Sequence, residues 1–184
     1  NTEQFISGNM PINLSSMEID NSFGVTLNQP ISIANTFTLT SGNLNTSAAN
    51  ILTMTSTSNV INNSALSFVN GPMKKTGNSS FVFPIGKNGN WRRLGISSPS
   101  TISSEVTAEY FDNQAINTSM INSPLNAVSV IENWQLDKSN PSDVLTIELF
   151  WEDATQSGIS DCAATTIAHY NGNSWENVNS TATG

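Results

Sequence analysis

Short segments in which apolar and polar residues alternate recur along the first half of the chain. They occupy residues 23–27, 37–40, 51–55 and 66–69. Alternation with a period of two places successive side chains on opposite faces of a β-strand. Phe23, Phe37 and Ile51 follow one another at intervals of fourteen residues, with turns such as Ser41-Gly42-Asn43 between the segments. This fixed step favours a short β-solenoid over residues 1–75, and an irregular antiparallel sheet of a single larger sandwich is the alternative.

Longer alternating segments follow in residues 76–184. Apolar residues share one face of each predicted strand, as in Phe81/Phe83/Ile85, in Val106/Ala108/Tyr110 and at the odd positions of 145–152. Asn88-Gly89 and Asn171-Gly172 lie between predicted strands, and an Asn-Gly pair supplies the two positive-φ positions of a type I′ hairpin. About seven strands with such turns predict an antiparallel β-sandwich, immunoglobulin-like or jelly-roll.

The composition agrees with an all-β fold that has a neutral, polar exterior. Asn, Ser and Thr fill 72 of the 184 positions, and these residues favour turns and strands over helix interiors. Only 11% of the residues are charged, and the net charge is −8. This negative charge repels phosphate backbones and anionic lipids, so we expect no nucleic-acid partner. The apolar runs fall far short of the ~20 residues of a membrane helix, so we expect no membrane insertion.

Residues with catalytic chemistry are sparse. Cys162 and His169 are single copies, which excludes an internal disulfide and a Cys/His zinc cage, and no Gly-x-Ser-x-Gly motif accompanies the histidine. The alternative is an enzyme that hydrolyses glycosides with a pair of carboxylates. Its candidates are five glutamates on predicted strands: Glu105, Glu109, Glu132, Glu148 and Glu152. Small sandwiches rarely have loops long enough to form a catalytic cleft, so we expect no enzymatic activity.

Binding residues are easier to nominate. Trp91 and Trp175 lie next to the Asn-Gly turns, where an exposed indole could stack on a sugar, whereas Trp134 and Trp151 fit core positions. Glu152, Asp153 and Asp161 surround a glycine turn with carboxylates and hydroxyls, which are ligands that calcium accepts. A solvated acidic turn without an ion explains the same residues, so we expect no cofactor, and calcium is the one candidate ion. Thr-x-Thr steps at Thr38/Thr40 and Thr53/Thr55/Thr57 could form a flat hydroxyl ladder, although strand propensity also explains them.

Several longer strings carry a family resemblance. They are residues 68–78 with Asn70-Gly71-Pro72, residues 81–87, Trp91-Arg92-Arg93-Leu94, and residues 107–111, 132–137 and 168–175. In these strings the chain resembles a module of large secreted and cell-surface proteins of Bacteroidetes. The matching strings occur in the same order from about residue 66 to residue 178. Residues 1–65 share only the general sequence character of the module and none of its specific strings.

The resemblance implies a short β-solenoid that ends at the Asn-Gly-Pro segment and is followed by a β-sandwich. It also implies export by the type IX system, at the cell surface or beyond, and adhesin-like, gliding-related or polysaccharide-associated roles. No type IX sorting domain is visible before Gly184, so export would depend on a longer parent chain with neighbouring domains. We therefore expect a non-catalytic structural or adhesive module that contacts a surface glycan or an extracellular protein. The alternative is a carbohydrate-binding accessory module of a secreted polysaccharide-degrading protein.

Overall fold

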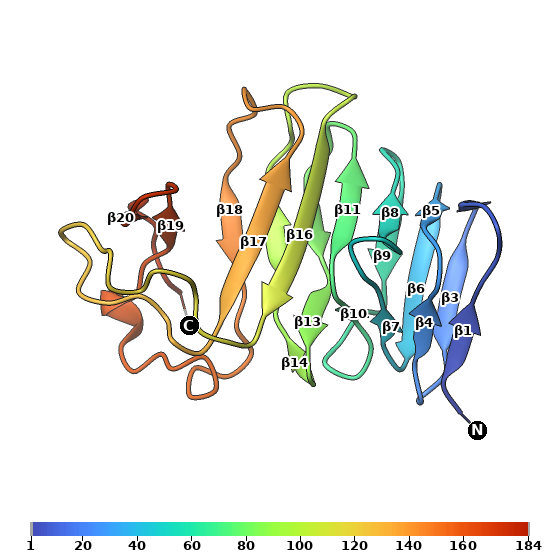
Figure 1. Ribbon diagram of the computed structural model, residues 1–184, viewed down its shortest axis with the longest axis horizontal. Helices are drawn as coiled ribbons and strands as arrows, with labels where there is room; N and C mark the ends of the chain where they lie inside the picture. Colours follow the sequence, from blue (N-terminus) through green and yellow to red (C-terminus); the bar gives the residue numbers. More distant parts are fainter. Residues whose placement is uncertain (1, 184) are drawn as a thin grey trace. The chain divides into compact units, whose positions relative to one another are not determined.

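The computed structural model describes residues 2–183, which form β-strands, turns and one 3₁₀-helix, η1 (Cys162–Ala164) (Figure 1). The all-β prediction is confirmed. The chain divides into two compact units. The first unit holds the residues up to Tyr110 together with Trp134–Phe150, and the second holds Phe111–Asn133 and the residues from Trp151 on. None of the described helices is long and apolar enough to cross a bilayer.

Three successive three-sided coils build the start of the first unit. Their strands are β1 (Gln4–Ile6), β2 (Ile12–Leu14) and β3 (Met17–Asp20), then β4 (Val25–Leu27), β5 (Ile31–Ile33) and β6 (Thr36–Ser41), then β7 (Leu44–Asn45), β8 (Leu52–Met54) and β9 (Asn59–Ile61). Each strand pairs in parallel with the strand at the same place in the next coil, which gives the sheets β1-β4-β7, β2-β5-β8 and β3-β6-β9. The predicted short β-solenoid is therefore confirmed, with about three turns.

The coil repeats at about 20 residues, so the predicted interval of fourteen is wrong. The fourteen-residue interval connected positions on different sides of the coil, because each turn contains three strands rather than one. Phe23 is 56% exposed at a corner, whereas Phe37 is fully buried in β6. The step also varies on one side: hydrogen-bonded partners are 19 residues apart from Thr26 to Asn45 and 25 apart from Asn45 to Asn70.

Inward-facing side chains stack in columns along the second side of the solenoid. One column is Ile12, Ile31, Leu52 and Met73, and the other is Leu14, Ile33, Met54 and Lys75. The residues between them, Asn13, Ser32, Thr53 and Lys74, stand in register on the outer face. Period-two alternation thus fills the interior with aliphatic groups and leaves polar groups in water, which is the main source of stability for such a stack.

Glycine is required at one corner of the solenoid. Gly42 follows β6 with φ +77°, a left-handed conformation that glycine adopts without strain. A Cβ atom at this position would lie 1.8 Å from the carbonyl oxygen of Asn21, one coil earlier. The predicted turn Ser41-Gly42-Asn43 is therefore the point at which two successive corners pack most closely.

The solenoid ends by changing from parallel to antiparallel pairing. Its last strands are β10 (Val69–Asn70) and β11 (Met73–Thr76), followed by β12 (Phe81–Phe83), β13 (Ile85–Lys87) and β14 (Asn90–Trp91). β13 continues the first side in parallel with β10, whereas β14 returns antiparallel through Asn88-Gly89. On the second side, β11 pairs antiparallel with β16 (Glu105–Phe111), and β17 (Asn133–Lys138) lies beyond it. The boundary expected after residue 75 falls inside β11.

A second antiparallel sheet completes the first unit. It contains β12, β15 (Leu94–Ile96) and β18 (Ile147–Leu149) in that order. Phe81, Phe83 and Ile85 are buried, as are Val106, Ala108 and Tyr110, so the predicted faces of these strands are confirmed. These side chains belong to one hydrophobic cluster with the interior of the solenoid.

The second unit contains the hairpin of β19 (Ala168–Tyr170) and β20 (Trp175–Asn177). The two Asn-Gly pairs behave differently. Asn88 and Gly89 both have positive φ, as a type I′ turn requires, whereas in the second pair only Gly172 does. The β19–β20 connection is a longer loop, in which the Asn171 carboxamide accepts hydrogen bonds from the backbone N–H groups of Asn173 and Ser174. The prediction of a tight turn at Asn171-Gly172 was therefore wrong in turn type.

Candidate functional site

All six basic residues lie between positions 74 and 138, and each contacts other groups of the protein. Lys74 forms an ion pair with Glu105 at 2.8 Å, and Lys87 lies 3.7 Å from Glu109. Lys138 donates hydrogen bonds to the carbonyl groups of Pro141 and Asp143. The charged residues of the first three coils are all acidic, because Lys74 is the first basic residue of the chain.

Lys75 occupies the interior of the solenoid, where it is 2% exposed. Its ammonium group donates to the carbonyl oxygens of Thr55, Ser56 and Ser58, and it lies 5.1 Å from the centre of the Phe81 ring. Burial lowers the pKa of Lys75 to about 8. At neutral pH the group therefore stays charged, and it holds together the corner between β8 and β9 by donating to three of its carbonyl groups.

Trp91 belongs to a packed aromatic and guanidinium stack. The Arg93 guanidinium lies 4.3 Å from the Trp91 ring and 4.4 Å from the Phe150 ring. The indole nitrogen of Trp91 is buried, and it has no hydrogen-bond partner among residues 2–183. The stack covers a ring face that sugar binding would use, so Trp91 could contact a glycan only through its remaining, partly exposed surface.

Trp134 packs against the core, as its sequence position predicted. Its ring lies 5.4 Å from that of Tyr110, and its indole nitrogen donates to the carbonyl of Arg92 at 3.2 Å. Arg92 itself is 2% exposed. Trp151 is partly buried in the second unit and lies beyond the end of β18.

Trp175 is anchored within the second unit. Its indole nitrogen donates to the Ile116 carbonyl at 2.9 Å, its backbone N–H donates to the Met120 carbonyl, and its ring lies 5.4 Å from that of Tyr170. The side chain stays partly exposed, so one portion of the ring is open to a ligand. Trp91 and Trp175 lie in different units, and nothing assigns them to one binding site.

The three predicted calcium ligands have separate local roles. The Asp153 carboxylate accepts hydrogen bonds from the backbone N–H groups of Thr155 and Gln156, and the Asp161 carboxylate caps η1 through the N–H of Ala163. Glu152 is exposed next to Asp153 and contacts other groups of the protein. Within residues 2–183, no three His, Cys, Asp or Glu side chains gather as a metal site, and calcium binding here stays a prediction.

The nucleophile and acid–base candidates are dispersed. His169 lies on the outer face of the β19–β20 hairpin, 3.3 Å from Glu176, and 62% of its side chain is exposed. Cys162 is partly buried at the start of η1. Glu105 and Glu109 are held by the lysines described above, and Glu132 is buried in the second unit.

The proposed threonine ladder does not form. Thr38 stands between Glu18 and Ile61 on the third side of the coil, whereas Thr53 stands between Ser32 and Lys74 on the second side. The structure shows a different polar ladder on the first side. Asn70 donates to the Asn45 side chain at 2.8 Å, Asn45 donates to Thr26 at 3.0 Å, and Thr26 donates to Glu3 at 2.5 Å. In the sequence, the one sign of this polar ladder is that Asn45 and Asn70 both lie near predicted strand segments, 25 residues apart.

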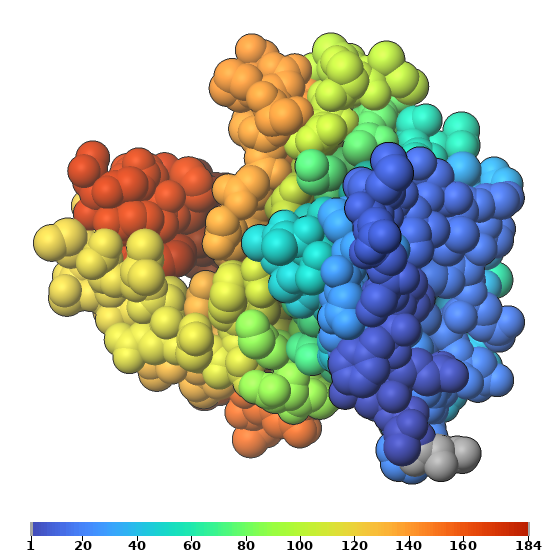
Figure 2. All heavy atoms as spheres, turned by 45° about the vertical axis from the view of Figure 1, so that its right-hand side comes forward, coloured from blue at the N-terminus to red at the C-terminus, as the bar shows by residue number. Residues whose placement is uncertain are grey.

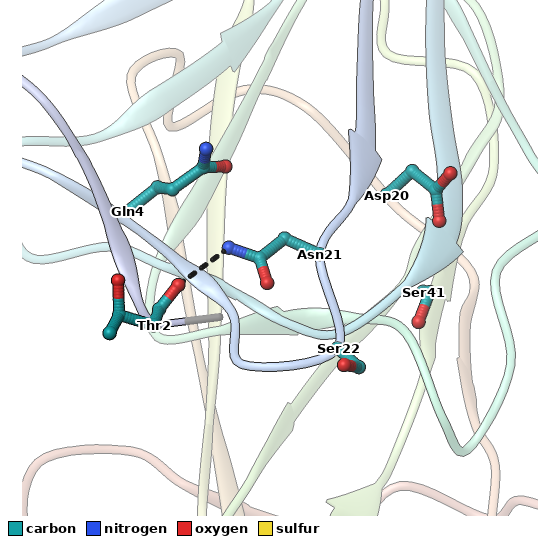
Figure 3. Close-up of a pocket in the computed structure, with 6 residues that line it drawn as sticks. All are labelled: Thr2, Gln4, Asp20, Asn21, Ser22 and Ser41. Atoms are coloured by element: carbon teal, nitrogen blue, oxygen red, sulfur yellow. Dashed lines mark hydrogen bonds between the residues drawn. The ribbon is translucent and has the colours of Figure 1, made fainter.

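Two hollows open on the surface of the first unit. One, of about 450 Å³, lies at the corner where β1 begins and β3 ends (Figure 3). It is lined by polar residues: Thr2, Gln4, Asp20, Asn21, Ser22 and Ser41. The Asn21 side chain donates to the Thr2 carbonyl across it at 3.1 Å, and its shape is open rather than enclosed (Figure 3).

The second hollow, of about 370 Å³, lies on the outer face of β12-β15-β18. Val82, Gly95 and Glu148 stand in one cross-strand row there, and the Glu148 side chain packs over Gly95, where a Cβ atom would lie 3.1 Å from its carboxylate. Hydroxyl groups of Ser80, Ser97 and Thr146 line the same hollow. A small apolar floor with hydroxyls and one carboxylate is suited to a neutral polar ligand rather than to an anion.

Comparisons with known proteins give no family assignment. No protein-family model matches the chain, no curated protein matches it, and no solved structure matches it.

Proposed function

We propose that this chain is a non-catalytic structural module, which acts outside the cell as a spacer or adhesive contact. The observation that carries the proposal is the pair of continuous inward columns, which pass through every coil on the second side of the solenoid. In such a stack each coil is stabilised mainly by contacts with its neighbours, which is what a structural spacer requires. The dispersed acid–base residues are in keeping with this role.

The proposal includes the β-sandwich expected over residues 76–184. Two antiparallel arrangements support it, namely β11-β16-β17 and β12-β15-β18. Val106 and Tyr110 from the first and Phe83 and Leu94 from the second contribute to the same hydrophobic cluster. The extracellular location and the type IX route rest on the resemblance described above, and the low content of charged residues is compatible with them.

Pulling the chain by its two ends tests the mechanical role. We expect the solenoid to open in separate steps of about one coil, each releasing roughly 70 Å for about 20 residues of extended chain. The I33D variant, which places a carboxylate in an inward column, should lose the step of the second coil. A smooth extension of the unmodified chain without separate steps would contradict the mechanical role.

A carbohydrate-binding role is the second candidate, and the hollow beside Gly95 is the observation that favours it. Retention on a panel of insoluble polysaccharides tests this role. Loss of retention in W91A or W175A would assign binding to the tryptophans, and loss in E148Q would assign it to the hollow. The structural proposal expects no retention. Hydrolysis of chromogenic glycosides that disappears in E148Q would overturn the non-catalytic assignment.

A further inference from the structure

The first coil leaves one edge open on all three sides of the solenoid. β1, β2 and β3 each lie at the end of their sheet, and within residues 2–183 no strand pairs with their outer edges. The N–H groups of Gln4 and Ile12 bond to the second coil. Because a parallel ladder uses alternate residues, the backbone groups of Phe5 and Asn13 point to the open edge. Figure 2 shows this first coil uncovered on the face turned towards the viewer.

The interior of the first coil is incompletely covered as well. Ile6, Ile12, Leu14 and Met17 are only partly buried, whereas their counterparts in the second coil, Leu27, Ile31, Ile33 and Phe37, are at most 2% exposed. Stacking buries these positions wherever another coil lies below them. The open end therefore combines unpaired backbone groups on three strands with partly exposed apolar side chains between them. The existing contacts between coils have the same arrangement.

From this arrangement we propose that the outer edges of β1, β2 and β3 form a docking surface for one more three-sided parallel coil, joined to β1 as β3 is joined to β4. The surface continues an interface that the chain already uses twice on all three sides. This inference goes beyond the mechanical role, because it concerns which partner the end of the solenoid accepts.

A second copy of the chain fits this end poorly. Head-to-tail docking would need free strand edges at the opposite end of the solenoid. On two of the three sides these edges are already paired, β11 with β16 and β13 with β14. Head-to-head docking would bring together two sets of Glu3, Glu18 and Asp20, with no basic residue before Lys74 to compensate them. Carboxylates at an edge discourage such self-pairing. A coil whose outward residues are hydroxyls, amides or bases fits instead.

A fusion tests the proposal. A copy of residues 25–43, the second coil with its following corner, is joined directly ahead of Gln4, so that Asn43 precedes Gln4 as it naturally precedes Leu44. We expect amide exchange of Phe5 and Asn13 to slow by about tenfold or more, since a bonded amide must open before it exchanges. The thermal midpoint should also rise. The matched control carries I31D and I33D in the added copy only, and it should leave exchange at Phe5 and Asn13 unchanged.

A second fusion guards against a copy that does not fold. It places residues 4–24, with E18Q and D20N in the added copy, ahead of Gln4, which repeats the first coil in its own register without stacking carboxylates on Glu18 and Asp20. If neither fusion protects Phe5 and Asn13, the proposal is overturned. It is equally overturned if the unmodified chain forms a dimer in sedimentation experiments and protects these amides as its concentration rises. These outcomes leave the pulling experiment unaffected, so the two proposals fail independently.

Discussion

Lys75 is the least expected residue of the core. Its neighbours Met73 and Lys74 alternate inward and outward, and the same alternation sends the Lys75 side chain into the column of Leu14, Ile33 and Met54. The sequence around Lys75 does not predict its burial, because the accepting carbonyl groups belong to a corner about 20 residues earlier. That interaction depends on coil stacking, which no local pattern contains.

The lowered pKa of Lys75 predicts a specific pH dependence of stability. The folded chain releases this proton near pH 8, whereas the unfolded chain keeps it until about 10.5. Between these values the unfolded state binds more protons, so the contribution of Lys75 to the free energy of unfolding increases with pH. Urea unfolding at pH 7.5, 9 and 10 should show a difference between wild type and K75M that changes with pH. A constant difference would contradict the buried lysine.

K75M should also destabilise the solenoid at neutral pH. The carbonyl groups of Ser56 and Ser58 would lose the Lys75 donor, at a cost of about 1–3 kcal/mol, whereas the Thr55 carbonyl keeps its hydrogen bonds from Ser58. K74M is the matched control, because Lys74 is partly exposed and its ion pair with Glu105 is expected to contribute only about 0–1 kcal/mol.

Asp143 predicts a pH dependence of the same sign, but in the acid range. Hydrogen bonds from the Ser100 side chain and backbone hold the pKa of the Asp143 carboxyl below its ordinary value. Its contribution to stability is therefore present above the pKa of the unfolded chain, about 3.9, and is lost as pH falls through the lower folded value. Thermal midpoints should fall less steeply in acid for D143N than for wild type. Equal acid sensitivity would show that this carboxylate does not tie residue 100 to residue 143.

Each coil gains its stability from the inward positions of short strands. I33A removes a fully buried side chain from the centre of a column and should cost about 2–5 kcal/mol in urea unfolding. S32A changes the adjacent outward residue of β5 and should stay within about 0.5 kcal/mol of wild type. Similar losses for the two variants would contradict the inward columns.

Alternation predicted the strand faces well and the coil repeat poorly. The burial of Phe81, Phe83, Val106 and Tyr110 follows from period-two patterning alone, because a strand has only two faces. The repeat depends on how many strands make one turn and on the length of each corner, and polar corners carry no periodic signal. For the same reason Asn-Gly predicted the turn at Asn88 correctly and the longer loop at Asn171 incorrectly.

The two units differ in how much apolar surface they bury. The buried hydrophobic residues are concentrated in the first unit, and Ala115 is the one such residue among the described part of the second. We therefore expect amides of β19 and β20 to exchange faster than those of β5, β8 and β11 under native conditions. Hydrogen exchange followed by mass spectrometry checks this order. Equal protection would mean that the units open together.

The candidate binding residues were harder to predict than the fold class. Trp91 and Trp175 were placed correctly beside turns, but the sequence could not show that Arg93 stacks on the first and that Ile116 accepts a hydrogen bond from the second. The hollow beside Gly95 arises from strands about 50 residues apart in the chain, β15 and β18. Such a site becomes visible only when cross-strand partners are known.

The uneven length of the coils has a practical consequence. The excursion between β9 and β10 is the longest connection between consecutive strands of the solenoid, Leu66 is 83% exposed there, and yet the inward columns keep their register. This excursion could accept a grafted peptide tag or a fluorescent label, because extra length there is absorbed by solvent-facing backbone. Foreign sequence could thus be displayed at this point while the stacked strands beneath it stay in place.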